Sequence, residues 1–431
     1  MICGNTHGFA AAGRLVFTAL FATTRKSRTS MILAALCLCG SGSLQAQTFT
    51  TLYLFGSGGI PEAGLVQGTD GNLYGTTFGY AGKQNGVIYK ITPSGAFTTL
   101  HSGGEFAAAL IQGTDGNFYG TSLAGGTAGY GWVFKITPSG TLTTLHNFGP
   151  LPNGTYPSAA LVQASDGNFY GTTKEGGTKS CLYGGTTNFG CGTLFKITPG
   201  GTLTTLHIFC SRSGCADGQA PGALVQGTDG NLYGTTSAGG NTACTGGCGT
   251  IFKITTTATL TTLHSFHLTD GDNPGAGLIQ ATDGNFYGMT YSGGANNSSN
   301  CTSGSCGTVF KITPAGSLTT LHKFDYTDGA NPIAPLIQAS DGNFYGTTGG
   351  GGNCTTFAGG CGTIFRITAT GTLTTLHSFD KTDGALPTVL VQDTDGTFYG
   401  TTIRGGTNAY HACGGYCGTI FSLSVGLVPV R

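Results

Sequence analysis

The chain carries very little charge. Only 8% of its 431 residues are Asp, Glu, Lys or Arg, against about 25% in an ordinary soluble domain. The 18 basic residues balance the 18 acidic ones, so no strong field exists to attract a polyanion. Glutamate is scarcest, with only Glu62, Glu105 and Glu175. A site built on paired carboxylates therefore has few residues to use, and we expect no nucleic-acid partner.

Recognisable catalytic motifs are also lacking. The sequence contains no Gly-x-Ser-x-Gly elbow, no His-Glu-x-x-His and no phosphate-binding Gly-x-x-x-x-Gly-Lys-Ser/Thr. Glycine is abundant, with 79 residues, and each Gly inside a helix costs about 1 kcal/mol relative to Ala. The hydrophobic share of 39% and the aromatic share of 10% are too high for a disordered chain. We expect an ordered, all-β protein that binds no cofactor.

Residues 1–46 have the order of a secretory signal peptide. The basic cluster Arg25-Lys26-Ser27-Arg28 precedes an apolar run from Met31 to Cys39, and small residues end at Ala46. The run is too short for a bilayer, which needs about 20 residues, so we expect no membrane span. The sequence predicts cleavage near Ala46 and a secreted, periplasmic or cell-surface protein; a buried N-terminal segment is the alternative. This leader holds four basic residues and no acid, so residues 47–431 carry a net charge of −4.

An internal repeat indicates the fold. Seven copies of Asp-Gly are each followed, two residues later, by an apolar residue, Tyr and Gly, and the copies are 45 to 63 residues apart. The aspartates are Asp70, Asp115, Asp166, Asp229, Asp283, Asp341 and Asp395. Each unit contains four short β-branched and aromatic segments between turn residues, which predict four strands, A to D. In the fourth unit A ends at Gln226, B covers residues 231–236, C covers 249–255 and D covers 260–264.

Seven such units predict a seven-bladed β-propeller. A four-stranded sheet buries little surface alone, so the sheets must stack around an axis. The last unit has no strand D, whereas the segment from Phe49 to Tyr53 resembles strand D of the first unit. We therefore expect the N-terminal strand, residues 48–55, to join the C-terminal blade and close the ring. Closure removes two exposed edges, and residues 47–431 then form one domain.

The repeated polar residues have structural explanations. Asp-Gly between A and B predicts a tight turn in which Gly supplies positive φ; a calcium loop would need several oxygen ligands, and each turn offers one carboxylate. We expect the Gln at the end of each strand A to bond backbone of the neighbouring blade. The six histidines that end strand D and the six cations in strand C are expected to be solvated cross-strand partners. These residues are His101, His146, His207, His264, His322 and His377, and Lys90, Lys135, Lys196, Lys253, Lys311 and Arg366.

The twelve cysteines after the leader fall into six close pairs. Five pairs lie between strands B and C of blades three to seven, and one lies between strand D and the next strand A. The pairs are Cys181 with Cys191, Cys210 with Cys215, Cys244 with Cys248, Cys301 with Cys306, Cys354 with Cys361, and Cys413 with Cys417. An even number in an exported chain predicts disulfides. Zinc is the rival, but it needs four ligands together, and these pairs lie one per blade, so we expect no metal site.

Length variation indicates the working face. In a propeller the B to C and D to A connections emerge on one face, and here they vary most in length, as binding loops do. Candidate ligand-binding residues in the B to C loops are Tyr80, Tyr130, Tyr183, Tyr291, Arg404, Tyr410 and His411. Candidates in the D to A loops are Asp270, Asp272, Asp325, Asp328, Asp380 and Asp383. The alternative for each is a solvated loop residue, which is the commoner role of a single loop residue, and the motif Asp-x-Thr-Asp-Gly at residues 325–329 and 380–384 can simply shape a turn.

The repeat unit resembles a known family. Leu-Val-Gln-Gly-Thr-Asp-Gly-Asn-Leu-Tyr-Gly-Thr-Thr, followed by Gly-Gly and Gly-Thr-Ile-Phe-Lys-Ile-Thr, is similar to the Gloeo-Verruco (GloVer) tandem repeat of bacterial exported proteins. The resemblance covers nearly all of residues 47–431 and implies an extracytoplasmic or surface-associated protein with no assigned activity. The unit is more distantly similar to blades of streptogramin B lyase and NHL propellers. The lyase typically has Trp-Phe-Thr-Glu in strand B; here every blade lacks that Glu, and the one Trp, Trp132, is in strand C.

The sequence favours a binding module over an enzyme. We expect a monomer that binds a polysaccharide or a cell-surface protein at the loop-rich face, with a channel mouth lined by Tyr, Asn, Ser and Thr. A lyase or hydrolase of the streptogramin B lyase type is the alternative. It would require ionisable side chains from different blades to converge at the mouth.

Overall fold

The computed structural model describes residues 47–427, except residues 57–58, 80–85, 151, 178–180, 184–185, 189, 295–300, 302–304, 355–359 and 407–416. The predicted signal peptide therefore lies outside the described residues. Residues 45–431 form one compact unit. In the described part of the chain, no helix has the length and apolar character that crossing a membrane requires.

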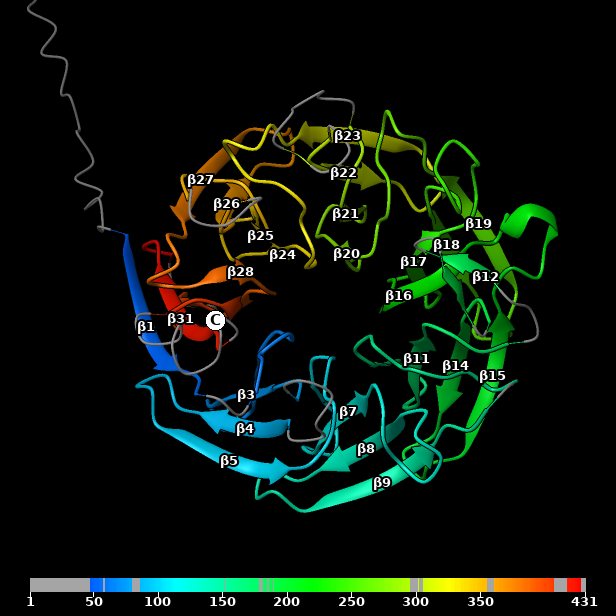
Figure 1. Ribbon diagram of the computed structural model, residues 1–431, viewed down its shortest axis with the longest axis horizontal. Coiled ribbons are helices and arrows are strands. Elements are labelled where there is room, and N and C mark those ends of the chain that lie inside the picture. Colours follow the sequence, from blue (N-terminus) through cyan, green and yellow to red (C-terminus); the bar gives the residue numbers. More distant parts are fainter. Residues whose placement is uncertain are drawn as a thin grey trace, which may run out of the picture. The chain divides into compact units, whose positions relative to one another are not determined.

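Seven antiparallel sheets form a β-propeller, as predicted (Figure 1). The first six sheets each contain one complete repeat, with strands A to D in sequence order from the axis outward. Blades one to three are β2 (Val66–Gln67), β3 (Leu73–Thr76), β4 (Val87–Ile91) and β5 (Phe97–Ser102); β6 (Ile111–Gln112), β7 (Phe118–Ser122), β8 (Trp132–Ile136) and β9 (Leu142–Asn147); β10 (Val162–Gln163), β11 (Phe169–Thr173), β14 (Thr193–Ile197) and β15 (Leu203–Ile208). Blades four to six are β16 (Gln219–Gln226), β17 (Leu232–Ala238), β18 (Thr250–Ile254) and β19 (Leu260–Ser265); β20 (Ile279–Gln280), β21 (Phe286–Thr290), β22 (Thr308–Ile312) and β23 (Leu318–Lys323); β24 (Ile337–Gln338), β25 (Phe344–Thr348), β26 (Thr363–Ile367) and β27 (Leu373–Ser378).

The two ends of the chain share the seventh blade. Strand β1 (Thr48–Leu54) pairs antiparallel with β31 (Thr419–Ser424), which pairs with β30 (Phe398–Arg404). Two short strands, β28 (Ala385–Pro387) and β29 (Val391–Gln392), pair with the other edge of β30. The N-terminal strand is thus the outermost strand of the C-terminal blade, which confirms the predicted closure.

Each blade packs an aromatic ring of strand C against a glycine of strand B. In blade four the buried Phe252 lies over Gly234, and a Cβ atom on that glycine would be 2.6 Å from the Phe252 ring. Real Cβ atoms do not approach so closely, so the glycine is needed for the close approach rather than for an unusual φ. The Gly of the Asn-Phe-Tyr-Gly motif is therefore a packing residue.

Aromatic stacking and threonine hydroxyls join neighbouring blades. The ring of Tyr233 in blade four stacks on Phe286 of blade five with centroids 4.0 Å apart, and equivalent pairs occur at other junctions. The Thr172 hydroxyl of blade three donates to the Gly222 carbonyl of blade four at 2.9 Å. Because both residue types belong to strand B of the repeat, one motif provides the core of a blade and its junction with the next.

A ring of glutamine contacts also joins the blades, as predicted for the Gln that ends strand A. Gln226 accepts a hydrogen bond from the backbone N–H of Ser165 in the preceding blade at 2.8 Å and donates to the Gly230 carbonyl of its own A to B turn at 3.0 Å. The same backbone contact recurs at Gln112, Gln163, Gln280, Gln338 and Gln392. At the closing junction Gln67 donates instead to the buried carboxylate of Asp393, which stands where other blades have Gly or Ala.

The Asp-Gly turns have the predicted geometry. Gly71 has a φ of 76°, and the equivalent glycines have similar values. The Asp70 carboxylate accepts hydrogen bonds from the Asn72 backbone at 3.1 Å, the Asn72 side chain at 2.7 Å and the Tyr74 hydroxyl at 2.8 Å. In blades one to six the aspartate thus holds its own turn and anchors a core tyrosine, and in blade seven Asp395 accepts from the Thr397 backbone. These roles explain its repetition without a bound ion.

Candidate functional site

The D to A and B to C connections lie together on one face of the ring, as expected. Backbone bridges join the two kinds of connection within a blade, for example Asp272 with Ser292 in blade five and Ala330 with Gly350 in blade six. These bridges fix the two variable loops of a blade to each other.

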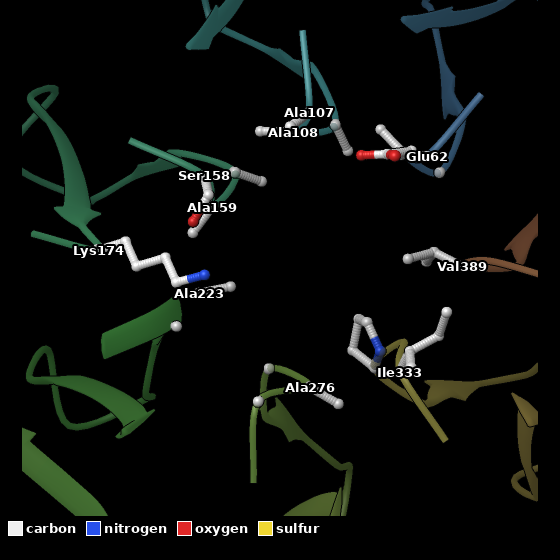
Figure 2. A pocket seen from close by; sticks show the side chains of 18 of the residues that line it. Glu62, Ala107, Ala108, Ser158, Ala159, Lys174, Ala223, Ala276, Ile333 and Val389 are labelled. Carbon is white, nitrogen blue, oxygen red and sulfur yellow. The ribbon is translucent and has the colours of Figure 1, made fainter. Parts of the chain in front are cut away.

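A cavity of about 460 Å³ lies on the axis at this face (Figure 2). All seven blades contribute to its wall, mainly through the residues around the start of strand A. Most wall residues are Ala, Gly or Pro, because seven chain segments approach one another here: a Cβ atom on Gly277 would be 3.1 Å from the Cβ of Ala223 in the neighbouring blade. Of the expected Tyr, Asn, Ser and Thr, the described residues of this wall include only serines, Ser158 and Ser237.

Two charged residues break the symmetry of this wall. Glu62 of blade one and Lys174 of blade three are the charged residues among those that line the cavity, and both side chains project into it (Figure 2). At the position of Glu62, five residues before the Gln of strand A, the other blades have Ala107, Ser158, Pro221, Gly275, Ile333 and Pro387. At the position of Lys174, immediately after strand B, they have Phe78, Leu123, Ser237, Tyr291, Gly349 and Ile403. A charge occurs once at each position.

The surroundings of Glu62 shift the pKa of its carboxyl. Its side chain is open to water in the channel, yet protein surrounds it on the other sides, and this burial raises the pKa of the carboxyl above its ordinary value. Glu62 can thus exchange a proton closer to neutral pH than an ordinary glutamate. Lys174 is also exposed to the channel, so the cavity presents one carboxyl and one amino group, from separate blades, to a bound molecule.

Three of the candidate aspartates are held by histidines. Asp270, Asp328 and Asp383 accept from the Nε2 atoms of His264, His322 and His377 at 3.1, 2.7 and 2.7 Å. Asp217 forms the same pair with His207 at 3.0 Å. These pairs tie the end of strand D to the D to A loop in blades three to six.

The expected pairing of histidines with strand C cations is wrong. Strand register places His264 opposite Ile251 and Lys253 opposite Thr261, so the two charged residues are not cross-strand partners. The cation lies near the aspartate of the A to B turn instead; Lys196 Nζ is 3.5 Å from Asp166 Oδ2.

Asp325 and Asp380 shape turns. The Asp325 carboxylate accepts from the Thr327 backbone at 2.9 Å and hydroxyl at 2.6 Å, and Asp380 makes the same bonds with Thr382. These bonds lower the pKa of both carboxyls more than burial raises it. Asp272 accepts from the Ser292 hydroxyl at 2.9 Å. None of these acids lines the axial cavity.

The aromatic and basic loop candidates are dispersed. Tyr130 is half-buried, with its ring 6.2 Å from that of Tyr156, and Tyr291 is half-buried beside Asn331, whose amide donates to the Tyr291 carbonyl at 3.0 Å. Arg404 ends β30 and is half-buried. The backbone of Tyr183 lies in β12 (Cys181–Tyr183), which forms a hairpin with β13 (Thr186–Asn188). Their roles in binding stay predictions, as do those of residues that lie outside the described part: Tyr80, Tyr410 and His411.

Five of the six predicted disulfides are confirmed. They join Cys181 with Cys191, Cys210 with Cys215, Cys244 with Cys248, Cys301 with Cys306, and Cys354 with Cys361. Cys417 is also disulfide-bonded, and its predicted partner Cys413 lies outside the described residues. All five confirmed bridges are in connections of the loop-rich face.

Among the described residues, two clusters each contain three potential metal ligands. One comprises Cys181, Cys191 and Cys210, and the other comprises Cys244, Cys248 and Asp272. Every cysteine in both clusters is in a disulfide. Because a metal binds the thiolate form of cysteine, neither cluster offers zinc a set of ligands in this state.

The axial pair Glu62 and Lys174 was not among the predicted site residues. A signal for both was present: each is the one charged residue at its repeat position, in a chain with 8% charged residues. The charged residues of the cavity are therefore found at positions where one unit differs from the other six, and not among the residues that all units share.

Known structures with related folds are weakly similar. The luciferin-regenerating enzyme is 11% identical, with a TM-score of 0.44, and the match covers 90% of this chain and 99% of that one. A gluconolactonase from Xanthomonas campestris is 10% identical, with a TM-score of 0.42, and the match covers 88% of this chain and 100% of that one. No curated protein matches the sequence. These likenesses carry no activity across to this chain.

The repeat itself has a clear relative. Residues 42–181 and 180–421 match the Gloeobacter/Verrucomicrobia repeat, so the match covers all seven blades. The chain therefore belongs to the Gloeobacter/Verrucomicrobia repeat family.

Proposed function

We propose that this propeller is a binding module of an exported protein and that it holds its ligand in the axial cavity of the loop-rich face. One observation carries the proposal: all seven blades form a wall of small side chains around about 460 Å³, with Glu62 and Lys174 as its charged residues. Ligand sites are typically concavities of about 300–1,000 Å³ with a few placed polar groups.

Export is part of the same proposal. The signal-like leader and the disulfides both support a secreted, periplasmic or cell-surface location, because disulfides persist in oxidising compartments. In that location the ligand comes from polysaccharide or from cell-surface protein, and we propose that the protein binds it as a monomer.

A cavity-filling variant tests the site. The purified protein is screened against polysaccharide, cell-wall and peptide fractions, and Ala107→Phe is compared with Thr98→Phe. Ala107 points into the cavity (Figure 2), whereas Thr98 is exposed on the outer strand β5. We expect Ala107→Phe to lose binding by at least about tenfold, since Phe fills space that the ligand needs, while Thr98→Phe binds normally. Equal binding by both variants would place the ligand elsewhere.

A lyase or hydrolase is the second candidate. It gains support from two ionisable side chains of different blades in one cavity, of which Glu62 has a raised pKa, as general acids often do. Product formation from the bound polymer that Glu62→Gln abolishes, with binding retained, would favour the enzyme over the binding module.

A further inference from the structure

We propose that the ligand of the axial cavity is a short peptide with free ends and an apolar side chain between them, an inference that rests on the proposed function. Glu62 would receive the terminal ammonium and Lys174 the terminal carboxylate, while the apolar side chain contacts the wall across from Lys174.

The placement of the two charges indicates a ligand with separated charges. Glu62 and Lys174 project from blades one and three, and Ala107 and Ala108 of blade two lie between them around the wall (Figure 2). A ligand that meets both residues therefore offers one charge to blade one and the opposite charge to blade three. A short peptide carries an ammonium and a carboxylate at opposite ends, about 10 Å apart in an extended tripeptide, and so can offer one charge to each blade.

The opposite side of the wall is apolar. Ile333, Pro335 and Val389 of blades six and seven line the cavity, and Ile333 and Val389 lie across it from Lys174 (Figure 2). Ile333 is 37% exposed, one of the few large hydrophobic side chains of the described chain with so much accessible surface. Covering it with an apolar side chain removes this surface from water and favours binding.

The wall composition favours a peptide over a sugar. The described residues that line the cavity include no Phe, Tyr or Trp, so among them a pyranose finds no aromatic face on which to stack. Glu62 and Lys174 are both exposed to the cavity, so a peptide that enters it can bring its two charged ends to them.

Blocked peptides test the assignment of the two ends. The purified protein is titrated calorimetrically, at neutral pH and low salt, with Ala-Leu-Ala, its N-acetylated form, its C-amidated form and free leucine. We expect the unblocked tripeptide to bind, and each block to weaken binding by about tenfold, since each removes one charged contact. Free leucine should bind more weakly than the tripeptide by a similar factor.

Charge-removing variants assign each end to a residue. Glu62→Gln should bind the free and the N-acetylated peptide equally, and Lys174→Gln should bind the free and the amidated peptide equally. The matched controls Glu175→Gln and Lys253→Gln remove charges that do not line the cavity and should keep both preferences.

Distinct results overturn the inference and the proposed function. Equal binding of free and doubly blocked peptide, or equal binding of leucine and tripeptide, would overturn the peptide assignment. Binding of polysaccharide that Ala107→Phe abolishes, with no binding of any peptide, would also overturn it while the binding function stands. If Ala107→Phe affects the binding of none of the fractions or peptides, both fail.

Discussion

Tyr89 is the residue at which the core of blade one departs from the other blades. Its ring takes the strand C position that Phe134, Phe195 and Phe252 occupy in blades two to four, and it lies over Gly75. The hydroxyl is fully buried and has no hydrogen-bond partner in the described structure. A buried, unsatisfied hydroxyl lowers stability because it has lost its bonds to water.

Replacing Tyr89 by Phe should therefore stabilise the protein. Removal of the unpaired hydroxyl is expected to raise the free energy of unfolding by about 1 kcal/mol, measured by denaturant unfolding. Tyr74→Phe is the matched control: the Tyr74 hydroxyl donates to Asp70 at 2.8 Å, so this variant should lose about 1 kcal/mol. A loss of stability in Tyr89→Phe would show that the hydroxyl is satisfied.

Asp217 is the most completely buried member of the His–Asp pairs. Its carboxylate is covered and accepts from His207 at 3.0 Å, from the Ser211 hydroxyl at 2.7 Å and from two backbone N–H groups. Burial alone would raise the pKa of Asp217, but these hydrogen bonds outweigh it and lower the pKa to about 2. The ionised carboxylate is thus a stabilising part of the fold.

Loss of this carboxylate should have a pH-dependent effect. A pKa that is lower in the folded state than the unfolded value of about 3.9 contributes stability above pH 4, and this contribution disappears as the pH falls to about 2. Asp217→Asn should therefore lose about 2 kcal/mol at pH 7 and differ little from the unmodified protein near pH 2, measured by denaturant unfolding at both pH values. An equal difference at both pH values would contradict the role of ionisation.

At the scale of the element, strand β1 closes the ring of blades. It pairs with β31 along its length, and Phe49 packs between His377, with centroids 4.0 Å apart, and Phe421, with centroids 5.3 Å apart. The strand therefore completes both the sheet of blade seven and its junction with blade six. The Gln67 to Asp393 contact joins the same blade to blade one.

Deleting residues 47–55 should sharply lower the melting temperature. The deletion exposes the edge of β31 and uncovers Phe421 and Leu423, both fully buried, so the ring loses hydrophobic burial and gains an aggregation-prone edge. The milder variant Asp393→Ala removes one contact of the same seam and should cost about 1 kcal/mol. An unchanged melt of the deletion would contradict closure by β1.

Most strands and turns could be predicted from the sequence because the same pattern of strand and turn residues occurs in seven units. The β-branched and aromatic segments, the Asp-Gly turns and the missing last strand were sufficient to predict the blades and their closure. The His–Asp pairs could not be predicted, because a histidine at the end of strand D and an aspartate six to ten residues later meet only when the loop folds back. Neither the strand composition nor the turn residues determine that loop geometry.

At the scale of the whole molecule, the disulfides are unevenly distributed. No cysteine occurs between residues 47 and 180, so blades one and two have none, whereas the described bridges lie in blades three to six. Each joins residues only 4 to 10 positions apart, so each removes little entropy from the unfolded chain. The ring is held by inter-blade packing, and the bridges stabilise loops.

Reduction should consequently leave the ring folded. The variant with Cys354→Ser and Cys361→Ser is expected to lose no more than about 2 kcal/mol, and the fully reduced protein should keep its β-type circular dichroism spectrum with a lower melting temperature. Disappearance of that spectrum on reduction at room temperature would mean that the bridges, rather than the blades, hold the ring.

The sequence by itself determined the number of blades, the order of strands, the closure and the cysteine pairs that the structure describes, because each is a local pattern repeated along the chain. Only the tertiary structure decided which residues meet at the axis. Glu62 and Lys174 are 112 positions apart and share a cavity because a ring brings the starts of seven separate strands to one place. The repeat pattern shows which residues the units share. The cavity depends instead on the residues in which the units differ, and only the closed ring brings these residues together.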